Sequence, residues 1–284
     1  MRPTAANLIP LLLLAAACQE PDAGDAPMAT RTHALLRVER SAYVGDTTPT
    51  SGLAFAGVVR VPELADPEPL LRLSGRGPML PAAGQCLAVN HESGTVLARD
   101  LSRAEFLDAG EVLLGTFDTQ TPLAPRAFPM ELSGVVYTSR DQASEALPSG
   151  AAYLLKTTGS AQLPGLELRV QAPEELRDVT VNGTALETLV DVSTSADVPL
   201  SWRAGDAGDL VYVEVLGPSA VGSVGVCAFR DGDGRGSLPR GLFGVSGSGS
   251  LALHRLREVA ADVPTLDGAE VRFDFALTAA VSFR

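Results

Sequence analysis

The stretch LELRVQA, residues 166–172, alternates apolar and polar side chains over seven positions. Successive side chains of a β-strand point to opposite faces, so this period of two predicts a strand with one buried face. No long helix competes with this pattern, and residues 102–107, opened by an S-x-x-E capping box, predict a helix of only one or two turns. We therefore expect an all-β fold. Similar strand-like segments precede the quoted stretch at residues 35–41, 53–61, 85–89, 111–116, 130–138 and 151–157.

A break follows directly, at Pro173 and the two glutamates after it. A second strand series then begins with the Asn182-Gly183 turn, in which both residues accept the positive φ angles of a tight hairpin. We expect two β-sandwich-like domains, residues 34–172 and 173–284, the second with the size of an ordinary sandwich of about 100 residues. The later segments of the second series are residues 198–203, 209–216, 223–230, 250–259 and 269–283.

The N-terminus is organised as an export signal. A basic start precedes an apolar segment, residues 8–17, that is too short for a membrane span of ~20 residues. Three alanines end this segment directly before Cys18, and the arrangement resembles the lipobox of bacterial lipoproteins, with Ala15 where leucine is usual. The resemblance implies cleavage before Cys18, acylation of that cysteine with palmitate-type chains and, with Gln19 next, delivery to the outer membrane. In the alternative, an ordinary signal is cleaved and Cys18 carries no lipid.

The segment after Cys18 is polar, with proline, glycine and aspartate and no apolar period, which is typical of a flexible linker. We assign residues 1–17 to a lipoprotein signal peptide and residues 18–33 to the acylated cysteine and its tether. Two or more acyl chains hold a protein on a bilayer lastingly, whereas one chain binds marginally. The expected partner is therefore the lipid bilayer, and the face of the outer membrane that the protein occupies is left open.

The charge balance excludes some other partners. The chain has 22 Lys and Arg residues against 34 Asp and Glu residues, a net charge of -12. Residues 1–17 hold one arginine and no acid, so their removal leaves 21 against 34, or -13. Such a surface repels nucleic acid and anionic lipid head groups. We expect no nucleic-acid partner and an anchor made by lipid, not by charge.

Cys86 and Cys227 remain once Cys18 is assigned to lipid. Both lie in apolar, strand-like surroundings, where cysteine often occurs as a small buried side chain. An oxidising compartment also permits a disulfide between them, provided that the two domains bring the Cα atoms within ~7 Å. The sequence leaves both possibilities open.

The second strand series also carries a family likeness. Residues 198–215, VPLSWRAGDAGDLVYVEV, resemble the early strands of fibronectin type III and immunoglobulin-like sandwiches. A tryptophan fills the core of such sandwiches, so we expect Trp202 in the core and not as a ligand platform. VCAFRDG and SLPRGL, residues 226–232 and 237–242, are similar to the C-terminal part of uncharacterised lipoproteins of Gram-negative bacteria. This resemblance implies an exported, two-part β protein and carries no activity.

The DGDGRG segment that follows offers carboxylates at alternate positions, Asp231 and Asp233, as at the start of an EF-hand calcium loop. Its fifth position is Arg235 and its twelfth is Leu242, where calcium needs an oxygen ligand and a bidentate glutamate. A turn rich in glycine and aspartate explains the segment without an ion. We expect a turn, with Asp231 and Asp233 as the remaining calcium candidate and no other metal site.

Catalytic and cofactor motifs are missing from the sequence. His91 begins like a zincin helix but lacks the second histidine four residues on, and no G-x-S-x-G elbow presents a serine. The chain has three histidines, His33, His91 and His254. We expect a non-catalytic structural or interaction module that uses no cofactor. The alternatives are a surface module that binds carbohydrate, peptide or calcium, and an envelope hydrolase in which carboxylates, or His91 and His254, converge in a cleft.

Overall fold

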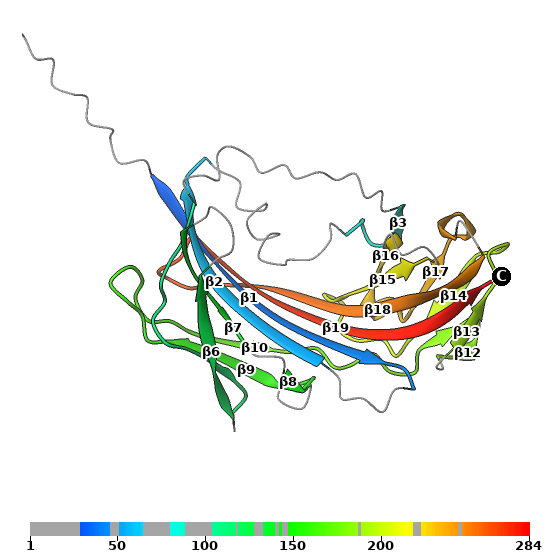
Figure 1. Cartoon of the computed structure of the whole chain (residues 1–284), viewed down its shortest axis with the longest axis horizontal. Helices are drawn as coiled ribbons and strands as arrows, with labels where there is room; N and C mark the ends of the chain where they lie inside the picture. Colours follow the sequence, from blue (N-terminus) through cyan, green and yellow to red (C-terminus); the bar gives the residue numbers. More distant parts are fainter. Residues whose placement is uncertain are drawn as a thin grey trace, which may run out of the picture.

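The computed structural model describes residues 29–45, 51–64, 80–88, 104–117, 119–127, 133–139, 142–143, 147–186, 189–217, 223–243 and 246–284. The regular secondary structure of this described part is strand, with two 3₁₀ turns and no α-helix (Figure 1). The expected all-β fold is confirmed. Among the described residues, no helix has the length and apolar character to cross a bilayer.

The strands of the first half are β1 (Thr30–Tyr43), β2 (Ser51–Pro62), β3 (Gln85–Ala88), β4 (Glu105–Phe106), β5 (Val112–Gly115), β6 (Gln120–Ala127), β7 (Ser133–Thr138), β8 (Gln142–Ala143), β9 (Ala152–Thr157) and β10 (Glu167–Gln171). The second half adds β11 (Thr180–Val181), β12 (Thr184–Ala185), β13 (Leu189–Val192), β14 (Val198–Ser201), β15 (Leu210–Leu216), β16 (Ser223–Arg230), β17 (Arg235–Leu238), β18 (Gly247–Ala261) and β19 (Gly268–Phe283). The 3₁₀ turns are η3 (Asp231–Asp233) and η4 (Arg240–Leu242).

Four long strands, β1, β2, β18 and β19, lie side by side and curve through the middle of the molecule (Figure 1). They belong to a 15-stranded sheet whose main order is β10-β9-β5-β6-β7-β4-β2-β1-β19-β18-β15-β16-β3. β1 pairs in parallel with β19, while the β1–β2 and β18–β19 pairs are antiparallel. A smaller sheet has the order β12-β11-β14-β17. The first and last strands of the described chain are therefore neighbours.

β19 shows how one long strand serves two hydrophobic cores. Its first half contributes Phe273 and Phe275 to one cluster of buried side chains, and its second half contributes Val281 and Phe283 to another. Burying a side chain of this size stabilises a fold by roughly 1.5–3 kcal/mol. The apolar residues at alternate positions therefore hold the strand at both ends.

The expected border between residues 172 and 173 separates Tyr153, in the first core, from Trp202, in the second. The first core also includes Phe273, from beyond the border. Hydrogen-bonded pairing nevertheless crosses the border, because β1 and β3 pair with β19 and β16. The division into two domains stays a prediction, and a connected sheet joins the two halves.

β1 begins at Thr30, before the expected end of the tether at residue 33. Thr30 pairs with Pro62 of β2, and Thr32 N donates to Asp267 Oδ2 at 2.6 Å. Backbone pairing therefore extends the strand into a segment that has no apolar period.

Of two local structures predicted from short sequence motifs, one is wrong and one is confirmed. The helix expected at residues 102–107 is wrong in its described part, because Glu105–Phe106 is strand β4, which pairs with β2. Pairing with a neighbouring strand outweighs the local capping motif there. The hairpin at Asn182 and Gly183 is confirmed: their φ angles are 54° and 74°, and they join β11 to β12.

Candidate functional site

A cavity of about 300 Å³ lies against one face of the long strands. Strand pairing places Ser41, Ala276, His254 and Tyr212 in one row across β1, β19, β18 and β15. Directly paired residues project their side chains from the same face of a sheet. Ala276 carries only a methyl group, so a hollow remains between Ser41 and His254.

An aspartate on β19 fixes two aromatic rings at one wall of the cavity. Tyr212 and His254 stack with ring centroids 4.2 Å apart and an interplanar angle of 14°. Tyr212 Oη donates to Asp274 Oδ2 at 2.5 Å, and His254 Nδ1 lies 2.7 Å from Asp274 Oδ1. In the neutral imidazole this contact keeps the proton on Nδ1, which leaves Nε2 as an acceptor. The Nε2 atom is buried and has no hydrogen-bond partner in the described structure.

Two carboxylates at the cavity are each paired with an arginine. Glu39 lies directly opposite Asp274 in the β1–β19 pair. Arg37 Nη1 is 3.2 Å from Glu39 Oε1, and Arg272 Nη2 is 3.5 Å from Asp274 Oδ2. Burial raises the pKa of Glu39, and Arg37 opposes this effect. Burial also raises the pKa of Asp274, but the hydrogen bonds from His254 and Tyr212 and the charge of Arg272 outweigh burial and lower that pKa.

We expect Asp274→Asn to destabilise the protein most at neutral pH and progressively less in acid. A carboxyl group whose pKa is lowered by folding stabilises the folded state fully above its unfolded pKa and loses this contribution as the pH falls through its folded pKa. The ordinary value is 3.8, so the difference in unfolding free energy between wild type and variant should shrink as the pH drops below 3.8. Urea unfolding at a series of pH values measures this difference. A difference that stays constant into strong acid would contradict the expectation.

Asp231, the calcium candidate, is fully buried beside Arg255 and Trp202. Asp231 Oδ1 accepts hydrogen bonds from Trp202 Nε1 at 2.9 Å and Arg255 Nη2 at 2.8 Å, and Arg255 Nε lies 2.8 Å from Oδ2. Asp233 is exposed, and the expected turn is present as η3, closed by Gly234 at a φ of 61°. Within the described ranges, no three His, Cys, Asp or Glu residues gather in a way that could hold a metal. The charge that faces the Asp231 carboxylate is therefore an arginine.

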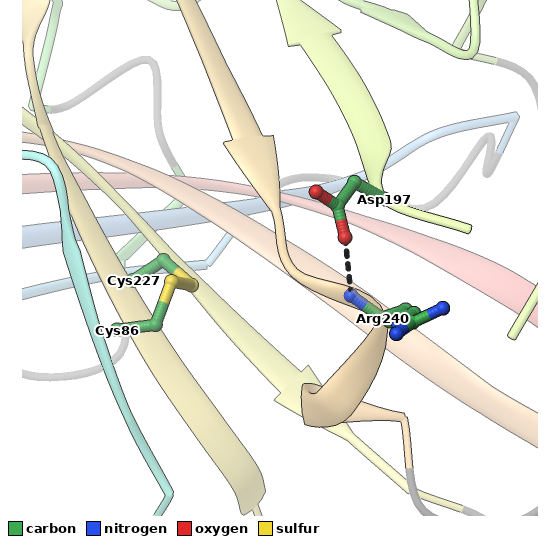
Figure 2. The surroundings of a disulfide bond; sticks show 4 residues. All are labelled: Cys86, Asp197, Cys227 and Arg240. Atoms are coloured by element: carbon green, nitrogen blue, oxygen red, sulfur yellow. Dashed lines mark hydrogen bonds between the residues drawn. A yellow bond between two sulfur atoms is a disulfide. The ribbon is translucent and has the colours of Figure 1, made fainter. Parts of the chain in front are cut away.

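Cys86 of β3 and Cys227 of β16 form a disulfide, as Figure 2 shows. The two residues are direct partners in the antiparallel β3–β16 pair, and Cys227 is fully buried. Nearby, Asp197 Oδ1 accepts a hydrogen bond of 2.9 Å from Arg240 N at the start of η4 (Figure 2). Of the two possibilities that the sequence left open, the structure has the disulfide.

Of the other residues singled out in the sequence, Cys18 and His91 fall outside the described residues. His33 lies in β1, and Trp202 lies in the second core as expected, with its ring centroid 6.0 Å from that of Phe229.

The sequence reasoning named His254 but missed its companions Asp274, Tyr212 and Glu39. A signal was available for Asp274, because it lies between two phenylalanines in a strongly apolar strand. A buried carboxylate needs partners, so an acid at such a position indicates a polar site. The residues of that site could not be named without the register of β1, β15 and β18 against β19.

Comparisons with known proteins assign no family. No protein-family model matches the sequence, and no curated protein matches it. Among solved structures, the Fcho1 Mu homology domain of Danio rerio with bound Eps15 peptide is similar over 90% of this chain and 97% of that chain. The TM-score is 0.29 and the sequence identity is 10%, values too low to relate the two folds.

Proposed function

We propose that this protein is exported, anchored by lipid at Cys18 to the outer membrane, and acts there as a non-catalytic structural or interaction module. The observation that carries the proposal is the short apolar segment that ends in three alanines directly before Cys18. Such a segment directs export, and a cysteine at this point is the acceptor of lipid in the lipobox that it resembles.

The disulfide between Cys86 and Cys227 supports export independently of the signal. Disulfides persist in oxidising compartments such as the bacterial periplasm and are rare where thiols are kept reduced. The expected net charge of the processed chain supports a lipid anchor, because it disfavours electrostatic binding to anionic lipids.

Ligand binding at the cavity is a second candidate, and the geometry favours binding over hydrolysis. Ser41 and Ser51 line the cavity, but their hydroxyls are hydrogen-bonded to each other at 2.6 Å. His254 Nε2 has no hydrogen-bond partner among the residues that the structure describes. A serine nucleophile is activated by a base within hydrogen-bond reach, so the His254–Asp274 pair lacks the serine contact of a triad.

We expect Cys18→Ala to abolish labelling of the protein by radioactive palmitate and to move it from the membrane to the soluble fraction. The reason is that the acyl chains have no other acceptor in the lipobox. As a control, Gln19→Asp should keep the label, because it leaves the cysteine in place. An unlabelled wild-type protein, or a native N-terminus with a bare thiol in mass spectrometry, would exclude the anchor.

A further inference from the structure

We propose that the cavity above Ala276 is a binding site for a small, neutral, polyhydroxylated molecule, such as a monosaccharide or the terminal sugar of a glycan. The residues that would bind it are Glu39, Ser41 and His254. The proposal rests on the second candidate function, ligand binding at this cavity, and holds whether or not Cys18 carries lipid.

The space for a ligand follows from the strand register. His254 and Ser41 flank Ala276 in the same row, so their backbones are two strand spacings apart, or about 10 Å. The small side chain between them leaves the cavity of about 300 Å³. This volume lies at the lower end of the range for small-molecule pockets, which suits a ligand of one ring.

The polar atoms around the hollow suit a ligand with several hydroxyl groups. Buried polar atoms are nearly always hydrogen-bonded in proteins, yet His254 Nε2 has no partner in the described structure. Asp274 holds the opposite nitrogen, so in the neutral ring Nε2 can accept a hydrogen bond from a hydroxyl once a small turn of the ring uncovers this buried atom. The Glu39 carboxylate adds acceptors, and the Ser41 hydroxyl, which shares one hydrogen bond with Ser51, can form another.

The charges favour a neutral ligand over an ion. Glu39 is paired with Arg37, and Asp274 is paired with Arg272, so each carboxylate at the cavity already has a positive neighbour. An ammonium ligand would gain little from carboxylates that are already compensated, and it would lose its own hydration on entry. An anionic ligand would meet both carboxylates, and the cationic residue of the lining, Arg40, is already paired with Glu175.

The stacked rings add a surface for the apolar side of a sugar. Tyr212 covers one face of the His254 ring. Ala276 is the next residue of the row on the other side of His254, and all three residues line the cavity. The uncovered face of the imidazole is thus turned toward the hollow, where it can pack against C–H groups. Pockets of this kind combine an apolar surface with a few placed polar groups.

The test uses the full processed chain, purified in a detergent without a sugar head group, and follows the histidine Cε1–H resonances by NMR. The chain has three histidines, so the His254 signal can be assigned from the spectrum of His254→Asn. The ligands are a panel of neutral monosaccharides and polyols, with an amine and a sugar acid of similar size as controls. We expect neutral members of the panel at millimolar concentration to shift the His254 signal in a saturable manner.

Ala276→Leu should weaken this binding at least about tenfold, because the larger side chain fills the hollow. The matched control is Ala280→Leu, the same change on the same strand at an exposed position on the same face, and it should bind like wild type. His254→Asn is a second variant that can keep the contact with Asp274 while it removes Nε2, and it should also weaken binding, as measured by calorimetry.

Four results would overturn the proposal. The first is that no neutral member of the panel shifts the His254 signal. The second is that Ala276→Leu binds like wild type. The third is that the amine or the sugar acid binds about tenfold more tightly than every neutral ligand. The fourth is turnover of an ester or a glycoside that requires His254, which would identify a hydrolase instead.

Discussion

Asp231→Asn is expected to lower the free energy of unfolding by about 3–5 kcal/mol, because it removes one partner of a buried ion pair and leaves the other charge uncompensated. Asp231 has no exposed surface, and the Arg255 side chain is 3% exposed. The substitution keeps the shape of the side chain and an acceptor for Trp202 Nε1, so the effect reports mainly the lost charge.

Loss of the Asp231 charge should affect more than the ion pair itself, because Arg255 has other partners. Its guanidinium also donates to the backbone carbonyls of Glu174, Glu175 and Arg203, at 3.2, 3.0 and 2.7 Å. Glu174 and Glu175 directly follow the expected border between the halves, so Arg255 connects this segment to β18. An arginine without its carboxylate would draw water toward this junction.

Urea unfolding followed by circular dichroism measures the change, and Glu167→Gln serves as the control. Glu167 forms an ion pair with Arg169 in which both side chains are largely exposed, so its neutralisation should change stability by no more than about 1 kcal/mol. If the two variants lost the same small amount of stability, the buried pair would not have the role assigned to it.

The features of the fold that sequence reasoning recovered depend on neighbours in the chain. The period of two in residues 166–172 predicted what is now β10, and the Asn182-Gly183 pair predicted its hairpin. The resemblance of residues 198–215 to immunoglobulin-like sandwiches implied the place of Trp202 in the core. In the first two cases the physical cause acts within a few residues.

The features that sequence reasoning missed depend on which distant strands become neighbours. The parallel pairing of β1 with β19 sets Glu39 opposite Asp274 and Ser41 opposite Ala276. A shift of one residue would turn every one of these side chains to the other face. No local pattern specifies that register, so the cavity could not be derived even though His254 was already a candidate.

Reduction of the Cys86–Cys227 disulfide is the second change with a large expected effect, a loss of about 5 kcal/mol in unfolding free energy. The two cysteines are 141 residues apart. In the chain-entropy model, a cross-link that closes so long a loop removes much of the freedom of the unfolded chain. The folded state loses little by comparison, because the β3–β16 pairing does not need the sulfur bridge to satisfy its backbone groups.

Cys86→Ser and Cys227→Ser both remove the disulfide, but we expect the two variants to differ in stability. Cys86→Ser removes the bridge at a partly exposed position, whereas Cys227→Ser also places a hydroxyl where the wild-type residue is fully buried. An unsatisfied buried hydroxyl costs about 1–3 kcal/mol, so Cys227→Ser should be the less stable variant.

Guanidinium unfolding with and without a reductant measures these differences, and hydrogen exchange of residues 85–88 and 225–228 shows whether β3 loosens first. Reductant should lower the unfolding midpoint of the wild type and leave that of Cys86→Ser unchanged. If the wild-type midpoint did not respond to reductant, the bond would contribute nothing to stability. Loss of exchange protection confined to residues 85–88 would instead show that it secures only the edge strand β3, which the main sheet order leaves with β16 as its one neighbour.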